Sequence, residues 1–396
     1  MPAYAITGAR LIDGSGEQPI DTAALVIRGD RIAAVGPAGD VEIPDDARVI
    51  DGSGMTVLPG LIDAHMHVGF GFTPVRKLQD SLSRGVTTVA TVTGGPEAPK
   101  LREAIEGDVI RGCARYHCGA VVGCTYGHLH REDENVAGVD ADGPWEVRRG
   151  VRQMVQAGAD FIKTAASGGF QWAAESLTWR NYTLEELTAL VDEAHAWGRR
   201  VSVHAHAQPG INTAIAAGCD MIHHGSYLDD DGLERLAASG VVLVPTLYIT
   251  SERSFSRESL PEHITERMKQ AHEPHREAVR RAHRLGITIA VGTDGGPGDA
   301  AYELQELVAC GMTPMEAILA GTRLTAQALG LEHRIGTLEP GKQADVLMVR
   351  GDPLEDIAIL EDQEAIALVL RDGKPPWGPA VVGQASPSIA ESGGYS

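Results

Sequence analysis

The chain has 396 residues and a formal net charge of −20, with 43% hydrophobic and 22% charged residues. Chains of this length form one large domain, or a large domain with a small one. The acidic balance argues against nucleic acid or an anionic membrane as a partner, because both require a basic surface.

The N-terminal segment lacks a basic stretch followed by an apolar run, and the sequence has no long uninterrupted apolar stretch. We therefore expect no signal peptide, no membrane span and a cytoplasmic location. The five cysteines form no C-x-x-C pair. An odd number of cysteines cannot form a complete disulfide framework, so we expect reduced and mostly buried thiols.

Both ends of the chain read as short strands separated by glycine turns. The first such region contains a predicted hairpin, in which residues 28–30 form the turn between strands 24–27 and 31–35. A similar pattern of short strands and glycine turns returns after residue 334, with the turn sequences "EPGK" and "RDGK". We predict one small β-sandwich domain built from residues 1–58 and 334–380. The small, polar ending 381–396 predicts a flexible tail.

The middle of the chain, residues 59–333, repeats a different unit: a helical pattern, a glycine, a short apolar strand and then polar residues. One repeat starts with a predicted capping box, Thr183 with Glu186. This βα repeat is typical of a parallel sheet in the α/β class. Eight strands, the number that closes a (β/α)8 TIM-like barrel, are expected near Leu61, Val86, Val121, Phe161, Val201, Met221, Val241 and Ile287.

Polar residues follow the predicted strands where each strand ends. In a barrel of this kind the C-terminal strand ends meet at one mouth, which holds the active site. The residues placed there are His65 and His67 after the first strand, His128 and His130 after the third, Lys163, His204 and His206, His224, and Asp294. Imidazole and carboxylate groups are ligands for zinc, manganese, iron or cobalt. The sequence therefore predicts a metal site at this mouth.

Lys163 requires a separate explanation, because an ammonium group among divalent cations is strongly disfavoured. A neutral amine can react with carbon dioxide to form a carbamate, which would replace the cation with a bridging anion. We predict this modification, which would allow two metal ions to share one hydroxide.

These motifs resemble the metal-dependent amidohydrolase superfamily over nearly the whole chain. The matching segments are "VLPGLIDAHMH", "FIKTAASGG", "VSVHAHA", "MIHHGS", "VGTDGG" and "GTLEPGKQADVLMV". The resemblance implies two divalent metal ions, most commonly Zn²⁺, and a carboxylated Lys163. It implies as metal ligands His65, His67, Lys163, His204, His224 and Asp294. His224, rather than His223, occupies the matching position, and His223 is interpreted as structural.

Within that superfamily the chain is most similar to the prolidase-like branch of Xaa-Pro dipeptidases, carboxypeptidases and ochratoxin-type amidases. It departs from that branch in "GCTYGHLHRED" and in the insertion "FQWAAESLTWRNYTLEEL", which carries Trp172 and Trp179. The two tryptophans either line a pocket or anchor the insertion. Both departures lie where a substrate would bind, so aryl-amide, urea and carbamate substrates stay open beside peptides and N-acyl amino acids.

The expected reaction is hydrolysis of an amide-type C–N bond by a metal-bridging hydroxide. Asp294 would accept a proton from the water and deliver it to the leaving amine. Tyr248 and His128 are candidate catalytic donors to the developing oxyanion and candidate substrate contacts. His206 is a candidate for binding substrate or supporting a ligand. The expected partner is a small-molecule substrate, and the protein is expected to form a homo-oligomer.

Two other classes remain as alternatives. A deaminase on the same fold resembles a site with one metal and a glutamate soon after the strand-five histidine, and no glutamate follows His204 closely here. A non-enzymatic scaffold would have lost metal ligands, whereas all six positions are filled. Four further histidines are interpreted as part of a solvated helical face: His263, His272, His275 and His283.

Overall fold

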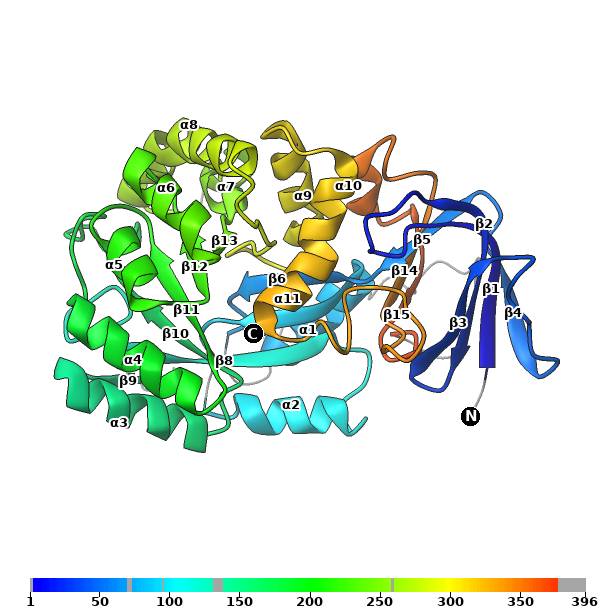
Figure 1. Ribbon diagram of the computed structural model, residues 1–396, viewed down its shortest axis with the longest axis horizontal. Helices are drawn as coiled ribbons and strands as arrows, with labels where there is room; N and C mark the ends of the chain where they lie inside the picture. The colour runs from blue at the N-terminus through cyan, green and yellow to red at the C-terminus, as the bar shows by residue number, and fades with distance from the viewer. Residues whose placement is uncertain (1–2, 70–72, 95, 131–137, 258–259, 377–396) are drawn as a thin grey trace, which may run out of the picture.

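The computed structural model describes residues 3–69, 73–94, 96–130, 138–257 and 260–376. The chain forms two parts, a helix-surrounded barrel and a smaller sheet domain beside it (Figure 1). The predicted tail at 381–396, and the end of the "GCTYGHLHRED" segment, lie outside the described residues. Within the described ranges, every helix is too short or too polar to span a lipid bilayer.

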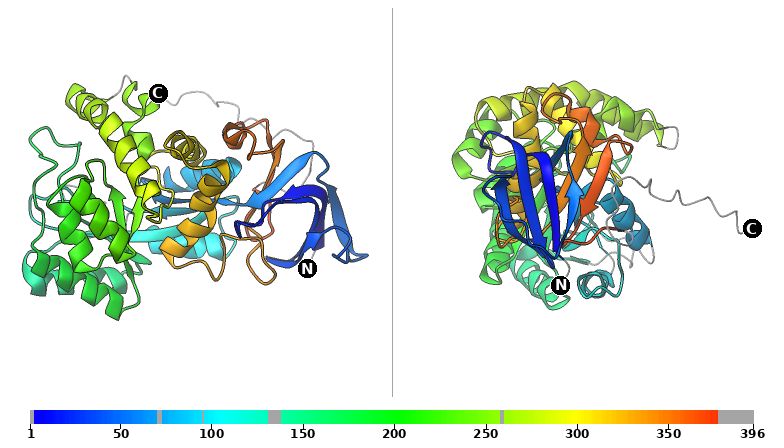
Figure 2. Two further views of the ribbon diagram at one scale, coloured as in Figure 1. Left: turned by 45° about the horizontal axis from the view of Figure 1, so that its top comes forward. Right: turned by 90° about the vertical axis from the view of Figure 1, so that its right-hand side faces the viewer.

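The sheet domain contains strands from both termini, as predicted, and Figure 2 shows the first and last strands in one layer. Its strands pair in the order β15-β14-β5-β1-β2-β3, with β4 beside β1. The predicted hairpin is present, with Ile27 opposite Ile32 and Arg28 opposite Arg31. The exact domain boundaries stay a prediction. The strands are β1 (Ala3–Leu11), β2 (Ile20–Arg28), β3 (Arg31–Pro37), β4 (Ala47–Asp51), β5 (Met55–Pro59), β14 (Val346–Arg350) and β15 (Ile366–Leu370).

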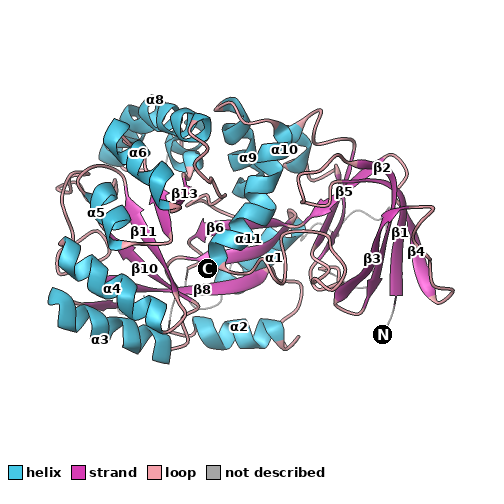
Figure 3. Cartoon of the chain, viewed as in Figure 1, coloured by secondary structure: helices cyan, strands magenta, loops and turns pink. Residues whose placement is uncertain are grey.

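The barrel is a parallel sheet in the order β13-β12-β11-β10-β8-β7-β6, with the short β9 beside β8 (Figure 3). Its strands are almost entirely buried, which explains their continuous apolar runs. They are β6 (Leu61–Met66), β7 (Val86–Thr91), β8 (Arg115–Gly123), β9 (Gly138–Asp140), β10 (Phe161–Ala165), β11 (Arg200–Ala205), β12 (Met221–His224) and β13 (Val242–Val244).

The eighth strand expected near Ile287 is replaced by an extended segment with isolated bridges. Leu243 of β13 pairs with Ile289, and Met66 of β6 pairs with Gly295, both in parallel. This segment lies between β13 and β6 and completes the barrel. Asp294 has a positive φ of 53°, which interrupts the extended geometry that a continuous ladder requires.

Helices cover the outside of the barrel, and the capping box at Thr183 and Glu186 begins α4 as predicted. The α-helices are α1 (Thr73–Ser83), α2 (Ala98–Glu106), α3 (Gly143–Gln156), α4 (Leu184–Ala196), α5 (Gly210–Ala217), α6 (Asp230–Ser239), α7 (Glu252–Phe255), α8 (Glu262–Arg284), α9 (Asp299–Ala309), α10 (Pro314–Leu319) and α11 (Thr325–Leu329). Two 3-10 helices, η1 (Leu247–Thr250) and η3 (Ile357–Leu360), and a π-helical turn, η2 (Ala320–Leu324), complete the set. All five cysteines are free and buried, as expected.

Candidate active site

A cavity of about 610 Å³ lies at the C-terminal ends of the barrel strands. It is lined by all six residues that the resemblance implied as metal ligands, together with His128, His130 and His206. Because these residues come from strands far apart in the sequence, only the closed barrel brings them together. The predicted convergence of the strand ends is therefore observed.

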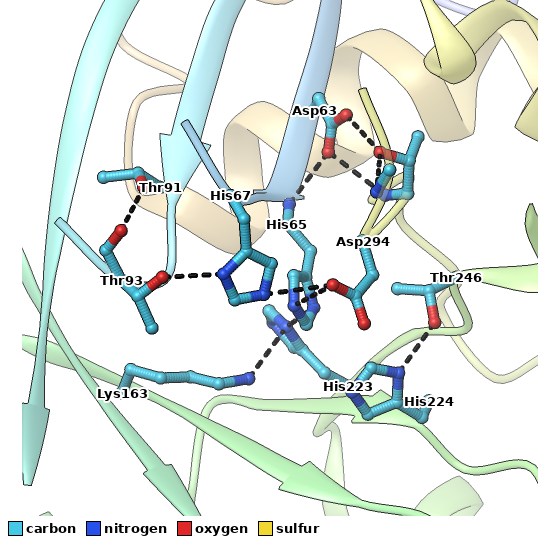
Figure 4. Close-up of polar contacts among 12 residues, drawn as sticks. Asp63, His65, His67, Thr91, Thr93, Lys163, His223, His224, Thr246 and Asp294 are labelled. Atoms are coloured by element: carbon cyan, nitrogen blue, oxygen red, sulfur yellow. Dashed lines mark hydrogen bonds and ion pairs between the residues drawn. The ribbon is translucent and has the colours of Figure 1, made fainter. Parts of the chain in front are cut away.

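Two imidazoles, those of His65 and His67, lie at the end of β6 (Figure 4), and both line the cavity. His65 is buried, whereas 46% of the His67 side chain is exposed. The His67 Nδ1 atom lies 2.7 Å from the Thr93 hydroxyl. Asp63 accepts hydrogen bonds from the His65 amide at 2.9 Å and from the Thr293 hydroxyl at 2.7 Å. Asp63 thus fixes the backbone that carries His65 relative to the segment that carries Asp294.

Asp294 faces both of these histidines (Figure 4). Its Oδ1 atom lies 3.0 Å from His67 Nε2 and 3.5 Å from His65 Nε2. Its amide donates to the His65 carbonyl at 2.7 Å. The carboxylate is held in this position by a backbone with positive φ, and strained backbone of this kind is concentrated at functional sites.

Lys163 extends from β10 into the barrel and is 2% exposed. Its Nζ atom lies 3.3 Å from His223 Nδ1, and that same nitrogen lies 2.7 Å from His65 Nδ1 (Figure 4). Burial lowers the pKa of Lys163 to about 7. The amine is therefore neutral in a substantial fraction of molecules at neutral pH.

Three further imidazoles form a compact group at the C-terminal ends of β11 and β12. The ring centroid of His224 lies 4.5 Å from that of His204 and 4.4 Å from that of His206. The donor atoms of His204, His206 and His224 could hold one metal ion, and those of His65, His224 and Asp294 form a second such group. His206, which the sequence assigned to substrate binding or ligand support, also meets the geometric requirement for a ligand.

Burial is the largest influence on all of these histidines. It lowers the pKa of each well below the usual value, and nearby positive groups lower it further. The neutral imidazole is the form that binds a metal ion. The residues to which this applies are His65, His204, His206, His223 and His224.

His224 is positioned from behind by residues that the sequence analysis did not identify. It has a positive φ of 79°, and its Nδ1 atom lies 2.8 Å from the Thr246 hydroxyl. His275 of α8 is fully buried, and its Nε2 donates to the His224 carbonyl at 3.1 Å. The interpretation of His275 as part of a solvated face is therefore wrong. Because α8 is rich in charged residues, its sequence did not indicate that one face of the helix packs on the barrel.

His128 has a carboxylate partner that the sequence analysis also missed. Its Nδ1 atom lies 2.9 Å from Glu175 Oε1, and its ring stacks on His204 with centroids 3.8 Å apart. A Cβ atom at Gly169 would come within 2.3 Å of the His128 ring. Glycine at this position therefore allows the ring to lie over the cavity. Glu175 comes from the long insertion, which has no periodic pattern that would place it.

Two other candidates differ in their access to the cavity. His130 lines it and pairs with Asp140 at 2.8 Å. Tyr248 is 2% exposed and does not line the cavity. Its amide donates to Glu303 at 2.7 Å, and its ring lies beneath the Arg257 guanidinium. A catalytic role for Tyr248 stays a prediction.

The comparison with protein families matches residues 56–375 to the amidohydrolase family. The chain belongs to the amidohydrolase family. This amidohydrolase is 33% identical to ochratoxinase from Aspergillus niger, over 94% of this chain and 86% of that protein. The match covers both the barrel and most of the sheet domain.

Two solved structures share the architecture. A Xaa-Pro dipeptidase with bound methionine in the active site superposes with a TM-score of 0.84 at 30% identity, over 94% of this chain and 98% of the other. Aspergillus niger ochratoxinase also gives a TM-score of 0.84, at 29% identity over 97% and 98%. These likenesses place the protein in the prolidase and ochratoxinase branch of the superfamily, among hydrolases that act on amide bonds. Enzymes of this family generally use divalent metal ions, and the histidine and aspartate groups above could hold them.

Proposed function

We propose that this amidohydrolase cleaves a dipeptide, an N-acyl amino acid or a related amide, with two zinc ions as its cofactor. The observation that carries the proposal is the convergence of four imidazoles, an amine and a carboxylate on one buried cavity. These groups belong to His65, His67, His204, His224, Lys163 and Asp294.

The donor set fits such a pair of ions. The donor atoms of His204, His206 and His224 lie within 4.8 Å of one another, as do those of His65, His224 and Asp294. A cation would satisfy lone pairs that are otherwise expensive to bury. Lys163, with its lowered pKa, would add through its neutral amine to carbon dioxide. The new N–C bond forms as one proton is released, which leaves an anionic carbamate between the two groups of ligands.

When bound, the metal ions would lower the pKa of a water molecule and polarise the scissile carbonyl. Asp294 would take the proton of that water and later transfer it to the leaving nitrogen. The Glu175 carboxylate accepts from His128 Nδ1, so His128 Nε2 would donate to the developing oxyanion when both ring nitrogens carry a proton. His128 is therefore the better placed of the two candidate oxyanion contacts, since Tyr248 is buried outside the cavity. His206 would orient the substrate or act as an additional ligand.

The test is a substrate panel with zinc-reconstituted protein, comparing N-acyl amino acids, dipeptides, aryl amides and carbamates. Asp294→Asn should lower kcat by about 10²–10⁴-fold, the contribution of a positioned acid and base, and kcat is expressed per metal-loaded enzyme because Asp294 is also a proposed ligand. Asp21→Asn is the matched control, because this side chain is 85% exposed in the sheet domain. Full turnover by Asp294→Asn would refute the proposed role. Native mass spectrometry should show one added carbon dioxide that is absent from Lys163→Met.

A further inference from the structure

A second, smaller cavity adjoins the active-site cavity. It has a volume of about 240 Å³ and shares two lining residues, His130 and Trp172, with the larger one. Pockets that enclose a whole drug-sized ligand measure roughly 300–1,000 Å³. The small cavity therefore suits one part of a ligand whose remainder occupies the active site.

Its walls are unusually aromatic for a surface feature. Trp172 and Trp179 are each 41% exposed, and Tyr126 is 73% exposed. The Tyr126 and Trp179 rings lie with centroids 6.3 Å apart and planes inclined by 33°. Large aromatic side chains gathered around a hollow, and only partly covered by the protein itself, are typical of ligand-binding sites.

Tyr126 is held in its exposed position at a conformational cost. Its φ is 59°, a value that bulky residues rarely adopt. The turn around it is fixed, because the Thr125 hydroxyl donates to Asp142 at 2.5 Å and the Gly127 amide donates to the Cys124 carbonyl at 3.0 Å. Local strain that persists in a well-fixed loop is evidence for a functional position.

The two tryptophans are equally well fixed. The Arg267 guanidinium, from α8, donates to five backbone carbonyls of their loop. The three shortest of these bonds reach Trp172 at 2.8 Å, Ala173 at 2.9 Å and Glu175 at 2.7 Å. The Trp179 amide donates to the Ser176 carbonyl at 3.0 Å. Preorganised aromatic walls of this kind lose little conformational freedom when a ligand binds.

The polar lining restricts the charge of the occupant. Glu175 also lines the small cavity and, as the hydrogen-bond partner of His128, carries a negative charge. A negatively charged ring would be repelled by this carboxylate, whereas a neutral ring would stack on the indoles.

We propose that the cavity bounded by Tyr126, Trp172 and Trp179 is a subsite for an uncharged, planar aromatic group of the substrate. The inference rests on the proposed amide hydrolysis and refines its substrate class: the preferred amides carry a bulky aromatic ring on one side of the scissile bond. It also decides between the two interpretations of the tryptophans in favour of the pocket.

The kinetic test uses zinc-reconstituted full-length protein and two matched substrate pairs. One pair places the ring on the acyl side, N-(2-naphthoyl)glycine against N-acetylglycine. The other places it on the amine side, N-acetyl-3-(2-naphthyl)alanine against N-acetylalanine. Trp179→Ala should lower kcat/KM by about tenfold for the naphthyl member of at least one pair, while the small substrates change less than about twofold. Trp145→Ala is the control, since Trp145 is 83% exposed on α3 and lines neither cavity.

A binding measurement separates this inference from the proposed activity. 2-Acetylnaphthalene has no hydrolysable bond, and its binding is followed by quenching of tryptophan fluorescence. Quenching that is lost in Tyr126→Ala and retained in Trp145→Ala would support the subsite even if no amide were hydrolysed. The subsite would be refuted if Trp179→Ala lowered kcat/KM equally for the large and the small substrates. It would also be refuted if kcat/KM fell in neither pair and Tyr126→Ala bound 2-acetylnaphthalene as the wild type does. In both cases the proposed hydrolase activity would stand.

Discussion

The buried arginine at the opposite end of the barrel provides a quantitative test of what joins the two parts of the molecule. Arg115 is the first residue of β8 and is 4% exposed. Its guanidinium donates to Asp345, immediately before β14, at 3.1 Å and to Asp372, after β15, at 2.9 Å. The Asp372 amide also donates to Asp345 at 2.9 Å. One cation from the barrel thus pairs with two carboxylates of the sheet domain.

Replacing Arg115 with methionine keeps most of the volume and removes the charge. Asp345 would then be buried without its cation and Asp372 would keep only the more distant Arg371, at 3.7 Å, a change that costs about 3–5 kcal/mol of unfolding free energy. Burial raises the pKa of Asp345. Burial also acts to raise the pKa of Asp372, but Arg115, together with Arg371 and Arg334, lowers it overall. Without Arg115 the pKa of Asp345 should rise further above the unfolded value of 3.8, and that of Asp372 should rise as well. Such groups destabilise the folded state increasingly as the pH rises above that value.

Urea unfolding of wild type and Arg115→Met between pH 4.5 and 7.5 measures this effect, with the difference between the proteins isolating Arg115. The deficit should be largest at pH 7.5 and shrink towards pH 4.5. Adding Asp345→Asn and Asp372→Asn should restore most of the stability. Arg284→Met is the control, because Arg284 is 62% exposed and pairs with the exposed Glu277, and its unfolding midpoint should hardly change. A deficit below about 1 kcal/mol, or one independent of pH, would refute the reasoning.

Two further predictions concern the supports of the active site. Glu175→Gln should lower kcat/KM by about 10–100-fold, because the charged hydrogen bond to His128 is worth about 1.5–3 kcal/mol. Steady-state kinetics should show this loss while the thermal stability is unchanged, and an unaltered kcat/KM would contradict the prediction. Thr293→Val removes the hydroxyl that donates to buried Asp63 at 2.7 Å. Urea unfolding should show a loss of about 1–3 kcal/mol in the free energy of unfolding, and Thr293→Ser, which keeps the hydroxyl, should retain most of the stability.

The periodic part of the fold could be predicted because the apolar spacing within each βα unit indicates where its helix and its strand lie. The segment that ends at Lys163 shows this, with α3 and β10 lying where the apolar spacing and the glycine placed them. The prediction of a regular strand near Ile287 was wrong, because the turn at Asp294 and the bridges to β13 and β6 depend on the closed barrel. Local sequence carries no information on such long-range pairing.

The residues of the candidate site likewise differ in how well the sequence predicts them. Residues such as His65 and His204 stand at the ends of recognisable strands, so their convergence follows from the fold class. Glu175 and His275 reach the site from an aperiodic loop and from a charged helix, and only tertiary contacts reveal them. An acidic partner for His128 could have been expected on chemical grounds, but no spacing rule identifies which of the many carboxylates provides it.

The two ends of the barrel therefore carry separable roles. Arg115 lies at the N-terminal end of β8, where it pairs with two carboxylates of the sheet domain. His128 follows the C-terminal end of the same strand and faces the cavity. Because the strand between them is rigid and buried, substitutions at Arg115 should alter unfolding without moving the cavity residues. The loops that carry Tyr126 and Trp179 lie at the C-terminal end. Substrate preference can accordingly change there, through exposed side chains, without altering either the metal ligands or the junction between the domains.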